Sequence, residues 1–293
     1  MKTIAKLLLI IVVCVALVAT TAGCDKPYSM KVYREDLVIG VQSPFAVLHT
    51  SDTHLTLAND LDSPSALVAA NERRGMGPGE KRLDFVAATA KQNDALVVHT
   101  GDALDFVTYA NMERFGAFLK ETNALYIPGN HEMDSLSEEF EATFYSMATD
   151  DVLFFSEEVG GVVFVGINNA NHKMTYEQLD RLKEVVATGK PVVLLVHVPL
   201  YSRDLYDASI SSSGSDNVAW LMAVPKELVD RYPAGYDFQK ADEATYAAYD
   251  YIVAQDNIKA ILCGHLHFDY TTKVGNIPEY VTGIDSVRLF NIR

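Results

Sequence analysis

The sequence predicts an α/β protein with a largely parallel sheet. From about residue 36 onward, short runs of β-branched and aliphatic residues alternate with stretches of helical periodicity, which is the pattern of βαβ units. There is no heptad or fixed-period repeat of the kind that indicates a coiled coil or a solenoid. Hydrophobic residues make up 49% of the 293 residues, so the chain can bury the core of one large domain or two small ones.

The apolar runs and the helical patterns define the expected elements. The expected strands span residues 37–41, 45–50, 95–100, 124–127, 161–167, 192–197, 259–263 and 287–292. The expected helices span residues 80–91, 112–121, 175–188 and 242–254. The helix over residues 175–188 is the clearest prediction, because Leu179 and Leu182 lie on one face, charged residues occupy the others, and Gly189 ends it.

Two stretches lack this alternation. Residues 55–79 are rich in Asn, Asp, Gly and Pro, and residues 200–240 contain a serine run, several tyrosines and the single tryptophan, Trp220. Long irregular loops in a compact domain tend to carry function. We therefore expect residues 200–240 to be an insertion that acts as a partial lid.

The first 23 residues have the pattern of an export signal. Lys2 and Lys6 precede an uncharged stretch over residues 7–23, which matches the basic and apolar regions of a signal peptide and is short for a membrane span. The segment ends in Thr-Ala-Gly-Cys. This ending resembles the bacterial lipoprotein signal, in which the cysteine, here Cys24, is lipidated, although Thr21 stands where that signal prefers Leu.

An ordinary secretory signal and an uncleaved anchor are the alternatives to lipidation, and each of the three places the body of the protein outside the cytoplasm. Residues 24–36 are polar and are expected to form a tether between the membrane and the folded part. A single domain is then expected over residues 37–293.

The charge balance limits the possible partners. The chain has 24 basic and 39 acidic residues, and its formal net charge is −15. Such a surface repels phosphate backbones, so no nucleic-acid-binding surface is expected. A strong local positive charge is therefore needed to attract any anionic substrate.

Polar residues follow five of the expected strands. The five segments are Asp52-Thr53-His54, Gly101-Asp102, Gly129-Asn130-His131-Glu132, His197 and Gly264-His265-Leu266-His267. The carboxyl ends of parallel strands lie at one edge of an α/β sheet. We therefore expect these segments to meet in one cleft, although they span more than two hundred residues of sequence.

Seven of these side chains are of types that bind metals: Asp52, His54, Asp102, Asn130, His197, His265 and His267. Imidazoles and carboxylates without a thiolate suit divalent transition metals such as Mn, Fe or Zn rather than Ca or Mg. Seven ligands are too many for one ion and suit two ions that share a carboxylate, and Asp102 at the middle strand end is the natural candidate to be shared. Two such ions would supply the positive field that the acidic surface lacks.

The five segments occur in the order D-x-H, G-D, G-N-H-[DE], a lone His after a strand, and G-H-x-H, over roughly residues 45–270. In this order and composition the sequence resembles the calcineurin-like metallophosphoesterases. The resemblance implies a four-layer αββα sandwich of two mixed sheets, and a dinuclear metal-dependent hydrolase of phosphomonoesters or phosphodiesters. It also implies the ligands of each ion. Asp52, His54, Asp102 and His267 would hold one ion, and Asp102, Asn130, His197 and His265 the other.

The resemblance further implies the candidate catalytic residues. His131 would contact the phosphate and protonate the leaving group, while a hydroxide bridging two ions roughly 3.5 to 4 Å apart attacks phosphorus in line. Asp105 matches the carboxylate that orients this histidine in the phosphoprotein-phosphatase branch, but Phe106 follows it where that branch has Arg. Asp105 is therefore either the partner of His131 or a solvated loop acid.

Other histidines and one acid near the motifs are expected to play supporting roles. His49 and His99 are expected in the strand core or behind the ligands, because the two ligand sets are already complete. His172 lies in an Asn-rich stretch and is expected in a solvated turn. Glu132 belongs to the G-N-H-[DE] segment but is expected to be structural.

The irregular stretches also carry arginines and aromatic residues. Arg73, Arg74 and Arg203 are candidates to clamp a phosphate or carboxylate through both guanidinium nitrogens, or they are ordinary surface arginines. The aromatic residues either form a wall that binds a base or a lipid, or pack the core of the insertion. They are Tyr201, Tyr206, Trp220, Tyr232 and Tyr236.

A solute-binding lipoprotein without catalytic activity is the alternative function. Its length, acidity and export signal would match this sequence. It predicts two lobes joined by a hinge, and it gives no reason for seven metal-type ligands at strand ends.

Overall fold

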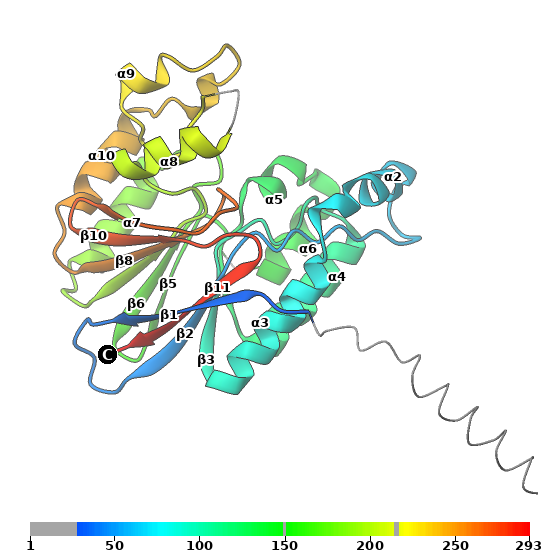
Figure 1. Ribbon diagram of the computed structural model, residues 1–293, viewed down its shortest axis with the longest axis horizontal. Helices are drawn as coiled ribbons and strands as arrows, with labels where there is room; N and C mark the ends of the chain where they lie inside the picture. Colours follow the sequence, from blue (N-terminus) through cyan, green and yellow to red (C-terminus); the bar gives the residue numbers. More distant parts are fainter. Residues whose placement is uncertain (1–27, 149–150, 214–216) are drawn as a thin grey trace, which may run out of the picture.

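The computed structural model describes residues 28–148, 151–213 and 217–293, which form two sheets flanked by helices (Figure 1). The first sheet has the strand order β1 (Lys31–Leu37), β11 (Ser286–Ile292), β2 (Phe45–Thr50), β3 (Ala95–His99) and β4 (Leu125–Tyr126). The second has the order β5 (Phe154–Val159), β6 (Val162–Ile167), β7 (Val192–Leu195), β8 (Ile258–Cys263), β10 (Ile277–Val281) and β9 (Tyr270–Val274).

Both sheets are mixed, with parallel strands at the centre. In the first sheet β2, β3 and β4 are parallel to one another, and β11 runs antiparallel to β2. In the second sheet β6, β7, β8 and β10 are parallel, and β5 and β9 are antiparallel at the two edges. Each of the five ligand-type segments follows one of these parallel strands: β2, β3, β4, β7 or β8.

Helices cover the outer face of each sheet (Figure 1). Against the first sheet lie α3 (Gly79–Asn93) and α4 (Tyr109–Thr122), with α6 (Glu138–Ala148) packed on α4. Beside the second sheet lie α7 (Tyr176–Val186) and α10 (Glu243–Val253), which contact each other. This arrangement confirms the predicted four-layer sandwich, and the four expected helices correspond to α3, α4, α7 and α10.

Three apolar clusters fill the spaces between the four layers. Leu83 of α3 and Phe115 of α4 belong to the cluster behind the first sheet. Phe164 and Phe290 belong to the cluster between the two sheets, and Leu182 of α7 belongs to the cluster behind the second sheet. Burial of this apolar surface is the main favourable term that holds the sheets at the distance the site requires.

The first strand lies earlier in the chain than the sequence predicts. Residues 31–37 form β1, paired in parallel with β11 along its whole length, whereas a strand was expected over 37–41. The expected tether over 24–36 is therefore wrong for residues 31–36, and residues 24–27 lie outside the described residues. Polar side chains of β1 are tolerated because it is an edge strand with exposed residues.

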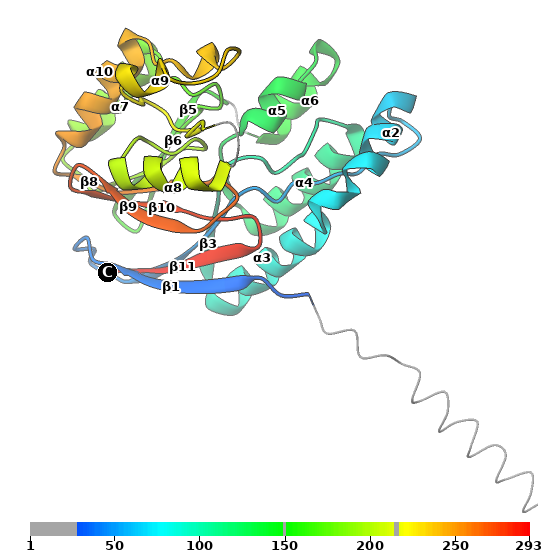
Figure 2. The same cartoon turned by 45° about the horizontal axis from the view of Figure 1, so that its top comes forward.

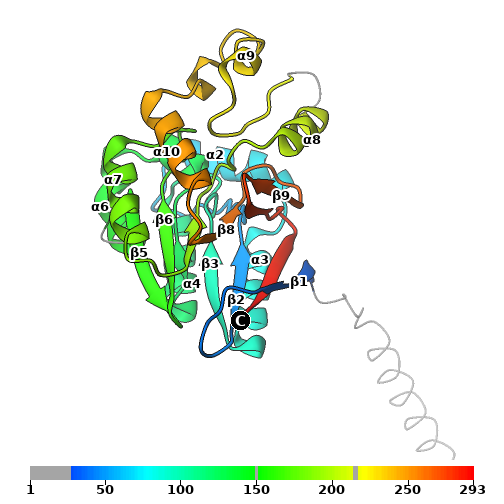
Figure 3. The same cartoon turned by 90° about the vertical axis from the view of Figure 1, so that its left-hand side faces the viewer.

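The two irregular stretches contain short helices. Residues 55–79 contain α2 (Pro64–Glu72) and the 3₁₀ helix η1 (Arg73–Met76), and residues 200–240 contain α8 (Arg203–Ser213), α9 (Lys226–Val229) and η2 (Asp237–Gln239). Figures 1 and 3 show α8 and α9 at the end of the molecule opposite the C-terminus. Figure 2 shows α8 beside β9, which it contacts. Within the described residues, no helix has both the length and the apolar character required to cross a membrane.

Candidate metal centre

The five ligand-type segments follow parallel strands of both sheets. Residues 52–54 follow β2, Asp102 follows β3, and Asn130 begins the short helix α5 (Asn130–Ser135) after β4. His197 follows β7, and residues 264–267 follow β8. The backbone of the first sheet's loops is joined directly, since the amides of residues 52 and 54 donate to the carbonyls of Gly101 and Asp102. Strand ends from two sheets thus form one cluster.

Four residues form the first ligand group. Asp52, His54, Asp102 and His267 each offer one ligand atom, and these atoms lie within 4.8 Å of one another. The Nε2 atoms of His54 and His267 are 3.0 Å apart, and Asp52 Oδ1 is 3.4 Å from Nε2 of His267. Ring nitrogens and a carboxylate that converge on one point are a donor set that suits a divalent transition metal.

The second group shares Asp102 with the first. Asp102, His197 and His265 offer ligand atoms within 4.8 Å of one another. Asn130 joins them, because its Oδ1 lies 3.1 Å from Nε2 of His197, and Asp102 Oδ2 lies 3.3 Å from that same nitrogen. The structure therefore brings together all seven predicted ligands with Asp102 between the groups. That each binds metal stays a prediction.

The histidines are oriented by bonds behind the cluster. His197 Nδ1 donates to the carbonyl of Thr100 at 2.8 Å, which leaves the lone pair of its Nε2 facing the other ligands. Nδ1 of His54 lies 3.1 Å from Asp105 Oδ1, so Nε2 of His54 also faces inward. Metal-binding histidines are usually held in this way, because the second hydrogen bond fixes the tautomer and the ring orientation.

The backbone at the ligands is in an unusual conformation. Five of the seven have positive φ: Asp52 at 55°, His54 at 47°, Asp102 at 50°, His265 at 68° and His267 at 59°. Each such residue costs on the order of 1 kcal/mol or more, and such residues persist only where the surrounding structure enforces them. Their concentration in one cluster marks it as a site selected for the placement of side chains.

Glycines allow the segments to approach closely. A Cβ on Gly129 would lie 2.1 Å from Asp102 Oδ1, and one on Gly264 would lie 2.2 Å from Asp52 Oδ2. A Cβ on Gly101 would lie 2.7 Å from His197 Nδ1. These contacts explain physically why the ligand-bearing segments contain glycine, since any side chain there would displace a ligand.

The cluster attracts positive charge strongly. Burial lowers the pKa of His54, but hydrogen bonds to Asp105 and Asp52 and the nearby negative charges raise it to about 10. Burial also lowers the pKa of His197, but the charge of Asp102 raises it to about 9. Burial favours protonation of Asp52, yet hydrogen bonds from His267 and His54 hold its pKa well below the usual value. These buried carboxylates require cations beside them, and two divalent ions fit that requirement.

His131 and Asp105 lie beside the first ligand group. His131 Nδ1 is 2.9 Å from the carbonyl oxygen of Asp105 and 3.3 Å from its Oδ1, while Nε2 is 4.0 Å from Asp102 Oδ2. The side chain of His131 is 26% exposed, so substrate can reach it, whereas that of Asp105 is fully buried. Asp105 is therefore not a solvated loop acid, and its contacts fit the partner of His131.

Arg73 holds Asp105 from the other side. Its Nε donates to Asp105 Oδ2 and its Nη2 to Oδ1, the second bond at 2.6 Å. Although burial raises the pKa of Asp105, this arginine and His54 hold it below the usual range. Arg73 was a candidate phosphate clamp, and the structure instead pairs it with a carboxylate. No sequence signal indicated this pair, because η1 and the loop after β3 meet only in the folded chain.

Three supporting residues lie where the sequence predicts. His49 is buried between Thr100 and Thr282, and His99 is buried against Thr53, so neither joins the ligand groups. Glu132 accepts hydrogen bonds from the backbone amides of Asp102, Leu104 and Gly129. It thereby fastens the loop after β3 to the start of α5, which is a structural role.

The structure also places His172, the candidate clamp arginines and Trp220. His172 is 3% exposed rather than solvated, and its ring centroid lies 5.1 Å from that of His265. Arg203 pairs with Asp207 on the exposed face of α8, and the side chain of Arg74 lies outside the described residues. Trp220 contacts the rings of His172 and His265, so this aromatic residue of the insertion reaches the ligand cluster.

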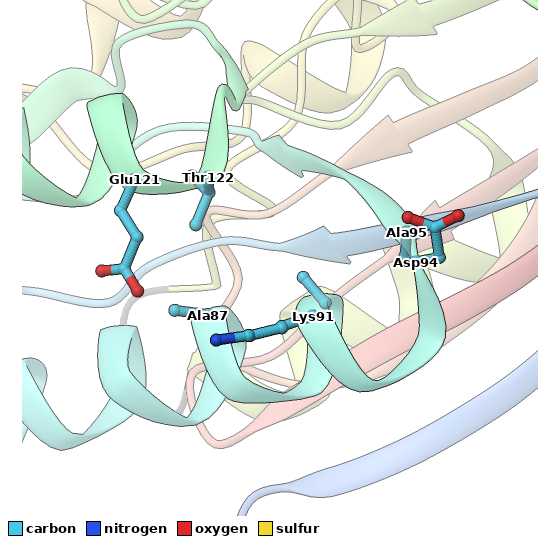
Figure 4. Close-up of a pocket in the computed structure, with 7 residues that line it drawn as sticks. Ala87, Lys91, Asp94, Ala95, Glu121 and Thr122 are labelled. Carbon is cyan, nitrogen blue, oxygen red and sulfur yellow. The ribbon is translucent and has the colours of Figure 1, made fainter.

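Another cavity, far from the candidate ligands, has no comparable set of metal-binding side chains. It has a volume of about 380 Å³ and lies where α3 and α4 lead into β3 and β4, lined by residues such as Lys91, Asp94 and Glu121 (Figure 4). None of the seven candidate ligands lines it. The arrangement of donors, rather than cavity size, therefore locates the candidate site.

Comparisons with known proteins agree with this geometry. The sequence model of the calcineurin-like phosphoesterase family matches residues 45–269, and no curated protein sequence matches the chain. Among solved structures, a dimetal phosphatase from Danio rerio is 13% identical, with a TM-score of 0.52, over 82% of this chain and 88% of that one. That similarity shows the fold alone.

Two further structures resemble the chain more weakly. A calcineurin-like phosphoesterase from Bacillus subtilis is 11% identical, with a TM-score of 0.43, over 82% of this chain and 81% of that one. A phosphopantetheinyl hydrolase from Mycobacterium tuberculosis is also 11% identical, with a TM-score of 0.43, over 87% of this chain and 91% of that one. The family match covers most of the sequence. The chain therefore belongs to the calcineurin-like phosphoesterase family, whose members hydrolyse phosphoester bonds with the aid of two divalent metal ions.

Proposed function

We propose that the chain is a dinuclear metal-dependent hydrolase of phosphomonoesters or phosphodiesters that acts outside the cytoplasm. The observation that supports this most directly is the pair of ligand groups that share Asp102. Asp52, His54, Asp102 and His267 would hold one ion, and Asp102, Asn130, His197 and His265 the other. When bound, two divalent ions supply Lewis acidity toward the phosphoryl group and make hydroxide available near neutral pH for in-line attack.

The residues around the ions then have distinct tasks. His131 faces the site with a partly exposed ring, and its Nδ1 is held by Asp105, so Nε2 can carry a proton to the oxygen of the leaving group. Asp105 orients both His131 and His54. Glu132 and the glycines at close contacts hold the ligand-bearing segments in fixed positions. This keeps the reacting groups correctly oriented, on which the rate of the reaction depends.

The experiment is a hydrolysis assay on the purified protein with manganese. A chromogenic phosphomonoester and a chromogenic phosphodiester are tested with and without chelator. We expect turnover of at least one ester, its loss in chelator, and its loss in the Asp102→Asn variant. His131→Gln should bind the same amount of metal yet lose about a hundredfold or more in kcat. The metal-loaded protein could instead bind a small-molecule solute and turn over neither ester. That result would favour the solute-binding alternative.

We further propose that the body is exported and attached to the membrane through a lipid on Cys24. Residues 1–24 carry the basic, apolar and cysteine-terminated pattern of such a signal. The test is cell fractionation of the wild type and of Cys24→Ser after labelling with palmitate. A labelled wild type in the membrane fraction and an unlabelled variant are expected. An unlabelled, soluble, exported wild type would indicate a secretory signal, and an unlabelled membrane-bound one would indicate an anchor.

A further inference from the structure

A second cavity opens directly beside the ligand groups. It has a volume of about 340 Å³, and His265 and His267 form one side of it. These two histidines belong to different ligand groups. An organic group attached to a phosphate held between the two ions would therefore enter this cavity.

The lining of the cavity favours an uncharged group. Apart from the two histidines, it is lined by Trp220, Leu266 and Phe268 and by two serines of α8. Neither Lys nor Arg is among the described residues that line it, and the whole chain is acidic. No cationic side chain of the described residues lines the cavity to pair with a second anionic group, whereas a neutral group would contact apolar and hydroxyl surface. The volume lies at the small end of the range for ligand sites, which suits one ring system.

Trp220 is held rigidly in the wall. Its φ is 55°, a conformation that is rare for a bulky residue and that persists only where the surroundings enforce it. The amide of the preceding Ala219 donates to Tyr232 Oη, and its carbonyl accepts from Ser209 Oγ. The backbone of Met222 is paired with the segment after His197. The ring is thus fixed relative to the ligands.

Aromatic neighbours also pack against Trp220, although they do not line the cavity. Trp220 contacts the rings of His172, Tyr236 and Phe238. His172 is almost fully buried, and neither of its ring nitrogens has a hydrogen-bond partner among the described residues. A buried polar group in this state is an exception that calls for a partner.

We propose that this cavity binds a neutral planar ring carried by the phosphoester, as in a nucleoside monophosphate, with Trp220 as the stacking surface and Ser209 and Ser212 at the ring edge. This inference rests on the proposed phosphoesterase function for its kinetic consequence, but not for binding of the ring itself. Stacking of a base on an aromatic side chain is strong enough to change affinity by about tenfold or more.

The binding test uses the single tryptophan as the probe. Adenosine, which has no phosphate, is titrated into the wild-type protein while Trp220 fluorescence is recorded, with glycerol as the control ligand. Saturable quenching by adenosine alone is expected. Ser212→Phe, which fills the cavity, should weaken this quenching about tenfold, and Ser211→Phe is its matched control. Ser211 is the preceding residue of α8, is exposed, does not line the cavity, and donates to the carbonyl of Asp207.

The kinetic test compares adenosine monophosphate with glycerol phosphate through the ratio of their kcat/KM values. We expect a ratio of about ten or more in the wild type and in Ser211→Phe, and a ratio lowered about tenfold in Ser212→Phe and in Trp220→Leu. Circular dichroism checks that each variant is folded. Because the ratio is taken within one protein, a general loss of activity does not mimic the effect.

The outcomes separate this inference from the proposed function. If the wild type hydrolyses both esters at equal kcat/KM and adenosine does not quench Trp220, the inference is overturned and the phosphoesterase function stands. If neither of these esters nor either chromogenic ester is hydrolysed, the proposed function fails, and the adenosine titration alone decides whether the cavity binds a ring. Equal weakening by Ser211→Phe and Ser212→Phe would also overturn the assignment of the ring to this cavity.

Discussion

Asp105 connects the ligand cluster with the proposed general acid through a single carboxylate. Its Oδ1 lies 3.1 Å from Nδ1 of His54 and 3.3 Å from Nδ1 of His131. Arg73 completes the arrangement by bonding to both carboxylate oxygens. A charge that is fully buried needs such partners, because an unpaired carboxylate in the interior is strongly disfavoured.

The contact with Arg73 leads to a prediction for activity. Replacement of Arg73 by Ala removes the partner of a buried carboxylate and loosens His131 and His54, so we expect kcat to fall by about tenfold to a hundredfold. Arg203→Ala is the matched control, because Arg203 also pairs with an aspartate but is exposed, and such pairs contribute little. Steady-state kinetics on both variants make the comparison. Equal effects would show that Arg73 has no special role.

Glu279 is a buried acid of β10 with one unpaired oxygen. Its Oε1 accepts from the amide of Leu200 at 2.8 Å, whereas Oε2 has no hydrogen-bond partner among the described residues. Burial raises its pKa from 4.5 to about 8. The folded state therefore binds this proton more tightly than the unfolded state between these two values, and the contribution of Glu279 to stability is lost as pH rises through that window.

Glu279→Gln should remove that dependence. The slope that Glu279 contributes to the free energy of unfolding is at most about −1.4 kcal/mol per pH unit, so the variant should gain stability relative to the wild type between pH 5 and pH 8. Urea unfolding at several pH values measures the difference. The other groups titrate equally in both proteins. If the free energies of unfolding of the two proteins change with pH in parallel, Glu279 is already ionised at the lower pH.

At the scale of elements, the loops after the parallel strands hold the site, and their glycines set how closely the strands approach. A Cβ on Gly264 would lie 1.8 Å from Ser51 Oγ, so Gly264→Ala must move β8's loop away from Asp52. We expect the variant to bind less metal, as measured by elemental analysis, and to lose about a hundredfold in activity. Gly116→Ala is the control, because this α4 glycine faces only the flexible Met147 side chain.

The sequence was most informative where pattern and chemistry coincided. Apolar runs that ended in Asp, Asn or His located β2, β3, β7 and β8 and placed the seven candidate ligands together, because strand ends of parallel sheets share an edge. β5 was not predicted because residues 156–158 are polar and exposed on an edge strand. A local sequence pattern reveals an element through the residues that the element buries. An edge strand buries few residues, so its pattern is weak.

Contacts between distant segments were beyond the reach of local patterns. The Asn-rich surroundings of His172 are typical of a solvated turn, yet Trp220 and Phe238, about fifty or more residues later, cover it. The pairing of Arg73 with Asp105 and the joining of β1 to β11 have the same origin. Each depends on packing between segments whose proximity is set by the whole fold.

At the scale of the whole molecule, metal binding should stabilise the fold. The ligands come from both sheets, so ions bound to them connect the two and favour the folded state by mass action, about 2.7 kcal/mol at a hundred times the dissociation constant. For a protein of this size, that corresponds to a rise of roughly 4 to 5 °C in Tm. Thermal unfolding with manganese and with chelator tests this. Asp102→Asn, which lacks the shared carboxylate, should show a much smaller difference.

The last strand in the chain occupies an interior position in its sheet. β11 lies between β1 and β2, so the first sheet cannot be completed until residues 286–292 have been synthesised. All strands of the second sheet precede β11 in the chain, so the second sheet can form before the first is complete. The first and last strands of the chain that the structure describes thus join only after everything between them has been made.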